Sequence, residues 1–181
     1  SMNLYLVRHG QTDFNKGEIV QGISDIPLNG TGIQQARALA PKIKDLEFDA
    51  YYVSPLLRAR QTAEIITDGK ADFQINNLLR ERSYGEIEGQ KVDLSSLGDV
   101  YDRRANISTY GIEPVRDLLA RAQKFLDQLK TTHDPDAKIL IVAHGALLRA
   151  MHFCILGYDD NTDFHAPGVR FQNCELREIG R

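Results

Sequence analysis

The strongest strand signal in this sequence is Lys138-Ile139-Leu140-Ile141-Val142, which leads through Ala143-His144-Gly145 into a helical pattern over residues 146–156. An unbroken apolar run of this length is typical of a strand buried on both faces, as in the middle of a parallel sheet. The same order opens the chain, where Asn3-Leu4-Tyr5-Leu6-Val7 runs into Arg8-His9-Gly10. Strand-to-helix units repeated in this way favour an α/β fold with a mostly parallel sheet.

The other predicted elements alternate in the same way between helix and strand. Ser54-Pro55 is expected to open one of the helices, because a serine hydroxyl accepts from a free backbone N–H at an N-cap and proline suits the first turn. No repeat or linker interrupts the pattern, which favours a single domain over residues 1–181. In chain order, the remaining elements are a helix over residues 31–45, a strand at 51–53, a helix from 56 to about 67, a weaker strand at 73–75, a helix over 114–130 and a last strand within 169–179.

Composition indicates a soluble globular protein and narrows the classes of partner. Hydrophobic residues make up 42% of the 181 positions and charged residues 26%, and no apolar run approaches the ~20 residues of a membrane span. The first apolar run, Leu4 to Val7, is too short for the core of a signal peptide. The net charge of −3 gives no reason to expect a nucleic acid or an anionic membrane as partner. Only two cysteines, Cys154 and Cys174, are present, without a CxxC pair, which disfavours disulfides and a thiolate metal site and favours the cytoplasm.

Two of the predicted strands end on a His-Gly pair, at His9 and at His144. In open α/β sheets, ligands bind beyond the carboxyl ends of the strands, so both imidazoles are expected at that edge. Arg8 directly precedes His9, and Arg58 falls near the first turn of the helix after the strand at 51–53. Guanidinium groups and helix N-termini suit a phosphoryl group, and Gly145 would let the backbone come close to it. One such pair alone is more often a turn, and Arg58 alone is more often a solvated helix residue; it is their coincidence that indicates a site.

At this point the sequence resembles the histidine phosphatase superfamily, also called the phosphoglycerate mutase-like family. The resemblance covers nearly the whole chain in order, and it is weakest from Gln90 to Tyr110. The motifs that carry it are Leu6-Val7-Arg8-His9-Gly10-Gln11-Thr12 with Asn15, Gln21-Gly22, Leu28-Asn29-Gly30-Thr31-Gly32, residues 54–63 from Ser54 to Ala63, Leu79-Arg80-Glu81-Arg82-Ser83-Tyr84-Gly85, Glu86-Ile87-Glu88-Gly89 and Ala143-His144-Gly145.

The resemblance implies a three-layer α/β/α sandwich with one antiparallel strand in a mostly parallel sheet. It also implies that His9 is the phosphorylated nucleophile, that Arg8, Arg58 and His144 bind the phosphoryl group, and that Glu81 is the proton donor. Without the resemblance, Glu81 would be taken for a surface residue beside two arginines. The resemblance also implies substrate contacts from Asn15 and the backbone of Gly145. Gln21 and Gly22, together with Arg82 and Tyr84 just after the proposed acid, are predicted as further substrate-binding residues.

Residues 90–113 are expected to form a short, variable lid over the site. Arg103 and Arg104 lie in this stretch and are predicted to contact a second anionic group of the substrate; the alternative is that they are exposed helix arginines. The mutases of the family use a longer insertion here to exclude water, so a short lid favours hydrolysis.

The predicted function is therefore hydrolysis of a small phosphorylated metabolite through a phosphohistidine intermediate. His9 must attack as a neutral imidazole, which the charge of Arg8 favours, and a carbonyl that accepts from its other ring nitrogen would fix the tautomer. Arg8, Arg58 and a protonated His144 would supply the positive charge, so neither a metal ion nor another cofactor is expected. Two alternatives remain: a phosphoglycerate mutase-type phosphotransferase and a non-catalytic phosphate-binding module.

Overall fold

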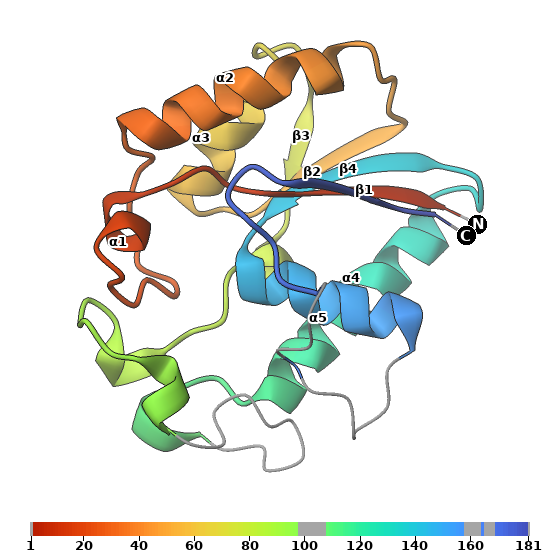
Figure 1. Ribbon diagram of the computed structural model, residues 1–181. Coiled ribbons are helices and arrows are strands. Elements are labelled where there is room, and N and C mark those ends of the chain that lie inside the picture. The colour runs from red at the N-terminus through yellow and green to blue at the C-terminus, as the bar shows by residue number, and fades with distance from the viewer. Residues whose placement is uncertain (1, 98–107, 158–163, 165–168, 181) are drawn as a thin grey trace.

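The sheet contains five strands in the order β3-β2-β4-β1-β5 (Figure 1). A computed structural model describes residues 2–97, 108–157, 164 and 169–180 of the chain. β4 lies between β2 and β1 and is parallel to both, β2 is also parallel to β3, and β5 runs antiparallel to β1. The central position predicted for the strand at residue 138 is therefore confirmed. The strands are β1 (Asn3–Arg8), β2 (Ala50–Val53), β3 (Phe73–Ile75), β4 (Lys138–Ala143) and β5 (Leu176–Ile179).

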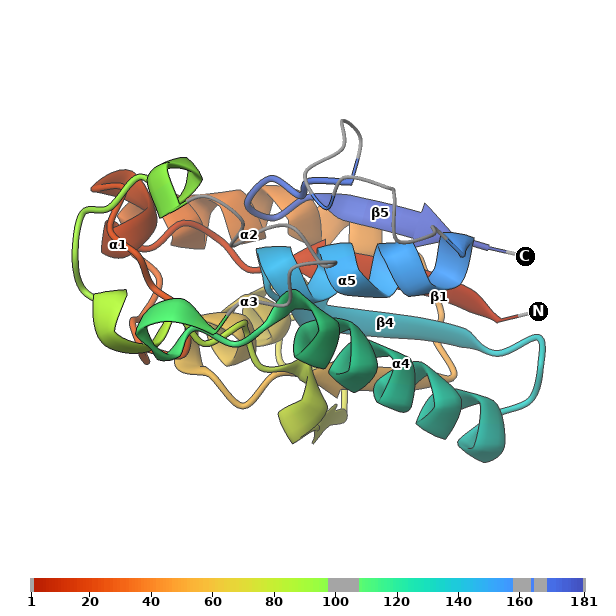
Figure 2. The same cartoon turned by 90° about the horizontal axis from the view of Figure 1, so that it is seen from below.

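Helices cover both faces of this sheet, which gives the predicted three layers. α2 (Gly30–Lys44) and α3 (Leu57–Ile66) lie on one face, and α4 (Val115–Thr132) and α5 (Gly145–Leu156) lie on the other (Figures 1 and 2). A hydrophobic core lies on each face of the sheet, and alternate residues of each strand contribute to one core or the other, because successive side chains of a strand point to opposite faces. The described short helices are α1 (Asp13–Lys16) and the 3₁₀ turns η1 (Asn77–Leu79), η2 (Gly85–Ile87), η3 (Leu94–Leu97) and η5 (Thr109–Gly111).

The prediction that Ser54-Pro55 opens α3 is wrong. Leu56 is the N-cap residue of that helix, and no side chain caps it. The Ser54 hydroxyl accepts from the backbone N–H of Leu56 at 3.2 Å and also contacts His144. The helix therefore starts later than predicted, because the serine belongs to the edge of the sheet where the histidines lie. None of the helices among the described residues is long and apolar enough to span a bilayer.

Candidate active site

His9 follows the end of β1 and is held in one orientation by its neighbours. Its side chain is buried, with 1% of its surface exposed. The ring Nδ1 lies 2.7 Å from the carbonyl oxygen of Gly10, which can only accept, so Nδ1 carries the proton and Nε2 carries the lone pair. The hydroxyl of Thr62 on α3 holds the backbone after His9, because it accepts a hydrogen bond from the Gly10 N–H at 3.1 Å. Gly10 therefore supplies the carbonyl that the predicted mechanism requires.

The surroundings of His9 keep its imidazole neutral. Burial lowers its pKa well below the usual 6.5, the charges of Arg8 and Arg58 lower it further, and the hydrogen bond to Gly10 opposes the shift only in part. The Nε of Arg58 lies 3.3 Å from Nε2 of His9, a contact that only an unprotonated Nε2 can accept. A buried, neutral nitrogen with a cation beside it suits a nucleophile that attacks a phosphorus atom.

Arg8 and Gly145 meet across the edge of the sheet, at the ends of β1 and β4. Nη1 of Arg8 donates to the carbonyl of Phe171 at 2.8 Å, whereas its buried Nε has no partner among the described residues. A β-carbon at Gly145 would lie 3.3 Å from that Nε. The absence of a side chain at 145 therefore leaves this charged donor uncovered.

Arg58, the second residue of α3, is fully buried and is oriented by the turn at Gly22 to Ser24. Its Nη1 donates to the carbonyl of Ser24 at 2.5 Å and its Nη2 to that of Gly22 at 2.6 Å. The carboxylate of Glu88 binds the same turn from outside, accepting from the Ile23 N–H at 3.2 Å and from the Ser24 N–H at 3.0 Å. Burial lowers the pKa of Arg58 to about 10, so the guanidinium stays charged at neutral pH.

His144 lies beside His9, with the two ring centroids 5.2 Å apart. Its Nε2 is 2.7 Å from the hydroxyl of Ser54, and its buried Nδ1 has no partner among the described residues. Burial, followed by the charge of Arg58, lowers the pKa of His144 well below 6.5. The expectation of a protonated His144 is therefore corrected for the free enzyme, where burial first, and the neighbouring positive charges second, favour the neutral imidazole.

The side chain of Glu81 lies at the N-terminus of α5, the helix that begins directly after His144. Its carboxylate accepts from the backbone N–H groups of Arg82 at 2.9 Å, Leu147 at 3.0 Å and Ala146 at 3.2 Å. Such groups at a helix N-terminus have no partner within the helix, so they stabilise a carboxylate there. The structure thus joins the predicted acid to the same edge as the two histidines.

The remaining residues predicted to bind the substrate differ in how the structure places them. The side-chain oxygen of Asn15 accepts from the Thr12 N–H at 3.0 Å, and that of Gln21 accepts from the Thr12 hydroxyl at 2.5 Å. Their amide nitrogens are therefore the groups with which they could donate to a phosphoryl oxygen. Arg82 and Tyr84 are buried together, with the guanidinium carbon 5.4 Å from the ring centroid. Arg103 and Arg104, and residues 98–107 of the predicted lid, lie outside the described residues.

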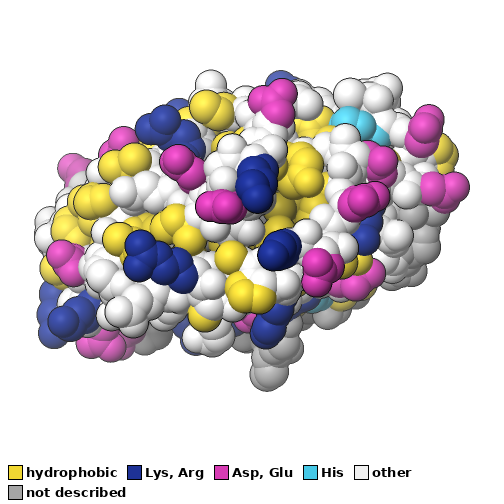
Figure 3. All heavy atoms as spheres, turned by 90° about the horizontal axis from the view of Figure 1, so that it is seen from above, with side chains coloured by type: hydrophobic (Ala, Val, Ile, Leu, Met, Phe, Trp, Pro, Cys, Tyr) yellow, Lys and Arg dark blue, Asp and Glu magenta, His cyan; other side chains and the backbone are white. Residues whose placement is uncertain are grey.

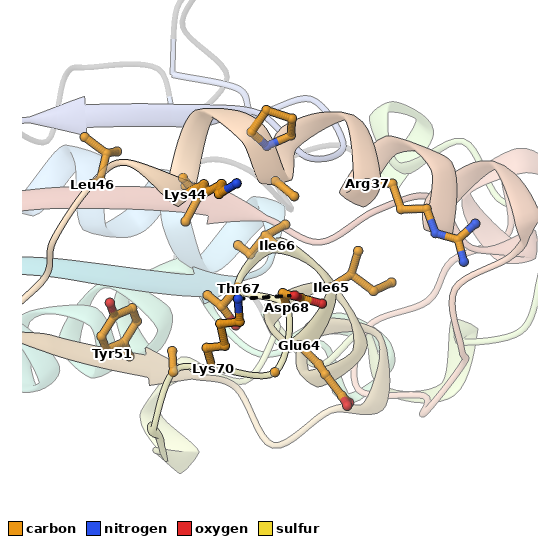
Figure 4. A pocket seen from close by; sticks show the side chains of 15 residues that line it. Arg37, Lys44, Leu46, Tyr51, Glu64, Ile65, Ile66, Thr67, Asp68 and Lys70 are labelled. Carbon is orange, nitrogen blue, oxygen red and sulfur yellow. Dashed lines mark ion pairs between the residues drawn. The ribbon is translucent and has the colours of Figure 1, made fainter.

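The surface over α2 and α3 carries a groove of a different character (Figure 3). This groove, of about 1020 Å³, is lined by side chains that include Arg37, Tyr51 and Glu64. At its rim, Lys70 and Asp68 form an ion pair of 3.6 Å (Figure 4). The charged residues that line it are of both signs, the cations Arg37, Lys44 and Lys70 and the carboxylates Glu64 and Asp68. The lining contains no histidine, so the groove has no counterpart of the nucleophile His9.

Comparison with known proteins identifies the family of this chain. A family model for branch 1 of the histidine phosphatase superfamily matches residues 4–181. The chain belongs to this superfamily.

Relatives within the histidine phosphatase superfamily include both phosphatases and mutases. An uncharacterized phosphatase of Bacillus subtilis, PhoE, is 38% identical over 157 residues, or 85% of this chain and 77% of that protein. A 2,3-bisphosphoglycerate-dependent phosphoglycerate mutase of Rhizobium etli is 34% identical over 164 residues, or 83% of this chain and 78% of that protein. The structure of mycobacterial glucosyl-3-phosphoglycerate phosphatase in complex with VO3 has a TM-score of 0.87 and 25% identity, and the match covers 99% of this chain and 93% of that one. Family membership and the phosphatases among its relatives confirm the prediction of an enzyme with phosphatase activity.

Three residues around the site have roles that the sequence did not predict. Ser54 contacts His144, Thr62 holds the His9 loop, and Glu88 binds the turn that orients Arg58. Ser54 and Thr62 lie within the family motif at 54–63, which is the signal that could have pointed to them. For Glu88 the signal was its place in the motif at 86–89, but nothing there indicates that the side chain reaches back to residues 23 and 24.

Proposed function

We propose that this protein hydrolyses small phosphate monoesters in two steps, through a phosphohistidine formed at Nε2 of His9. The observation that carries the proposal is the arrangement of that nitrogen, which is unprotonated, buried and 3.3 Å from a charged guanidinium. In the first step the Nε2 lone pair attacks the phosphorus, and the bond to the leaving oxygen breaks. Glu81, when it carries a proton, gives it to the leaving oxygen, which departs as an alcohol.

In the second step water attacks the phosphorus and the bond to His9 breaks. Glu81, now a carboxylate, takes a proton from that water, and inorganic phosphate leaves. Arg8 and Arg58 hold the phosphoryl oxygens throughout, because charged donors placed where negative charge develops are the main source of catalysis in phosphoryl transfer. The buried Nδ1 of His144 and the amide nitrogens of Asn15 and Gln21 are further donors for these oxygens.

The same first step would serve a phosphoglycerate mutase, and the relative from Rhizobium etli is an enzyme of that kind. The two functions differ in what accepts the phosphoryl group of His9, water or the bound substrate. We assign water as the acceptor because residues 90–113, the stretch expected to form the lid, are shorter than the insertion that the resemblance implies for the mutases of the family. We also propose that the protein acts in the cytoplasm on a small phosphorylated metabolite.

The experiment that tests this choice supplies 3-phosphoglycerate with a trace of 2,3-bisphosphoglycerate. Formation of 2-phosphoglycerate and release of inorganic phosphate are measured in the same samples. Phosphate release should exceed isomerisation. Isomerisation that outpaces hydrolysis by an order of magnitude would make the protein a mutase and leave only the first step in common.

A further inference from the structure

Arg121 on α4 binds the stretch of chain that carries the proposed acid. Its Nη1 donates to the carbonyl oxygens of Leu78 at 2.8 Å and of Arg80 at 2.7 Å. Its Nη2 reaches the carbonyl oxygen of Glu81 itself at 3.3 Å. A single guanidinium thus fixes three backbone carbonyls within four consecutive residues, directly before and at the acid.

Glu113 completes the surroundings of this guanidinium. Its carboxylate accepts from Nε of Arg121 at 2.9 Å and from Nη2 at 2.8 Å, in a forked pair whose side chains are only 21% and 17% exposed. These contacts engage every nitrogen of the guanidinium. The backbone of Glu113 also binds the residues after the acid, since its N–H donates to the Ser83 carbonyl at 2.9 Å and its carbonyl accepts from Nε of Arg82 at 2.7 Å.

The two sets of contacts hold the acid's backbone from α4, while α5 holds its carboxylate through Ala146 and Leu147. A general acid must come within hydrogen-bond distance, about 2.6–3.2 Å, of the oxygen that it protonates. Displacement by about 1 Å is enough to cost on the order of 100-fold in rate. The side chain of Glu81 is short, so its reach depends on where its backbone lies.

We propose that Arg121, locked by Glu113, is a positioning residue that sets the location of Glu81 for proton transfer to the leaving group. The inference rests on the proposed function, in which Glu81 is the acid. It predicts a defect that depends on the leaving group. Alkyl phosphates need a proton on the departing oxygen, whereas aryl phosphates leave as stable phenolates and need little help.

The test compares Arg121→Lys with the parent enzyme on an alkyl phosphate and on p-nitrophenyl phosphate. Lysine keeps the positive charge near His144, but one ammonium cannot bind the forked carboxylate and three carbonyls together. We expect kcat/KM for the alkyl ester to fall by roughly 10- to 100-fold and that for the aryl ester to fall by less than about 3-fold. Inhibition by vanadate should change little, because Arg8 and Arg58 are untouched.

Three further variants make the test selective. Arg37→Lys, an exposed helical arginine on α2, is the matched control and should behave as the parent enzyme. Glu113→Gln keeps the three carbonyl contacts of Arg121 and should show the same selectivity with a smaller loss. In Glu81→Gln/Arg121→Lys, the second change should add no further loss on the alkyl ester, because residues that act as a unit are not additive.

The outcomes separate the inference from the proposed function. If Glu81→Gln lowers alkyl and aryl turnover equally, Glu81 is not the acid, and the inference falls with that assignment. If Glu81→Gln is selective but Arg121→Lys and Glu113→Gln are not, only the inference is overturned. Losses from Glu81→Gln and Arg121→Lys that multiply in the double variant would also overturn it. Circular dichroism and thermal unfolding of each variant identify any loss that comes from misfolding.

Discussion

Replacing Gly145 with alanine should separate catalysis from stability in this protein. Gly145 is the first residue of α5, and its added β-carbon would lie 3.3 Å from Nε and 3.6 Å from Cζ of Arg8. That distance is tight, and Arg8 cannot easily retreat because its Nη1 is bound to the Phe171 carbonyl at 2.8 Å. The methyl group would therefore cover the one donor of Arg8 that lies buried and without a partner among the described residues.

The expected size of the effect follows from the loss of one charge-assisted hydrogen bond to the phosphoryl group. Such a bond contributes about 1.5–3 kcal/mol, which corresponds to roughly a 10- to 150-fold fall in kcat/KM. Folding should not suffer in the same way. Replacing glycine with alanine at a compatible helical position stabilises a protein by about 0.4–1 kcal/mol, and the tight contact of the added β-carbon with Arg8 would reduce this gain.

The assay measures kcat/KM on a phosphate monoester, vanadate affinity and urea unfolding for Gly145→Ala beside Gly30→Ala. Gly30 is the matched control, because it is the first residue of α2 and a β-carbon there meets nothing within 4 Å. Gly30→Ala should keep full activity, whereas Gly145→Ala should lose activity and vanadate affinity together at unchanged or higher stability. Full activity in Gly145→Ala would refute the role given to Nε of Arg8.

Three more outcomes follow from the site. Activity should survive chelators and be inhibited by vanadate, because Arg8 and Arg58 supply the positive charge; a strict magnesium requirement would contradict this. Ser54→Ala removes the 2.7 Å contact to His144 and should lower kcat/KM by up to about 10-fold with the fold retained, as circular dichroism would verify. Burial holds the pKa values of His9 and His144 well below 6.5, so the unfolded chain binds more protons there, and the free energy of unfolding should fall as the pH drops below about 6.5. Urea titrations at pH 5 and pH 7 on the parent and on His9→Asn/His144→Asn would check this, and an equal slope in both proteins would contradict it.

The sequence was sufficient for the α/β element order and for the placement of His9, Arg58 and His144 near one edge of the sheet, whereas the three layers and the choice of Glu81 came from the resemblance to the family. Hydrophobic runs and helical periodicity predict the order of the strands and helices. His9 and His144 follow parallel strands whose carboxyl ends lie at the same edge of the sheet. Arg58 could be predicted for the same reason, since it stands in the first turn of the helix that follows β2.

The supporting contacts could not be predicted, because they join residues far apart in the chain through the direction of individual side chains. Ser54 shows this most clearly, since the same hydroxyl would suit an N-cap, and only the packing of β2 against β4 brings it to His144. Arg121 has the helical spacing of a surface residue, and its role appears only when the stretch from residue 78 to 81 crosses α4. The neutral state of His144 is likewise a consequence of burial, which local sequence does not encode.

The most direct test of the central claim is to trap the phosphoenzyme. The enzyme is mixed rapidly with a phosphate monoester labelled in its phosphoryl group, quenched in alkali, digested and analysed by mass spectrometry. The account predicts one phosphorylated residue, His9, whose phosphoryl group is stable in base and labile in acid, as a phosphoramidate is. A phosphoaspartate or phosphoserine, or full activity in His9→Ala, would contradict it.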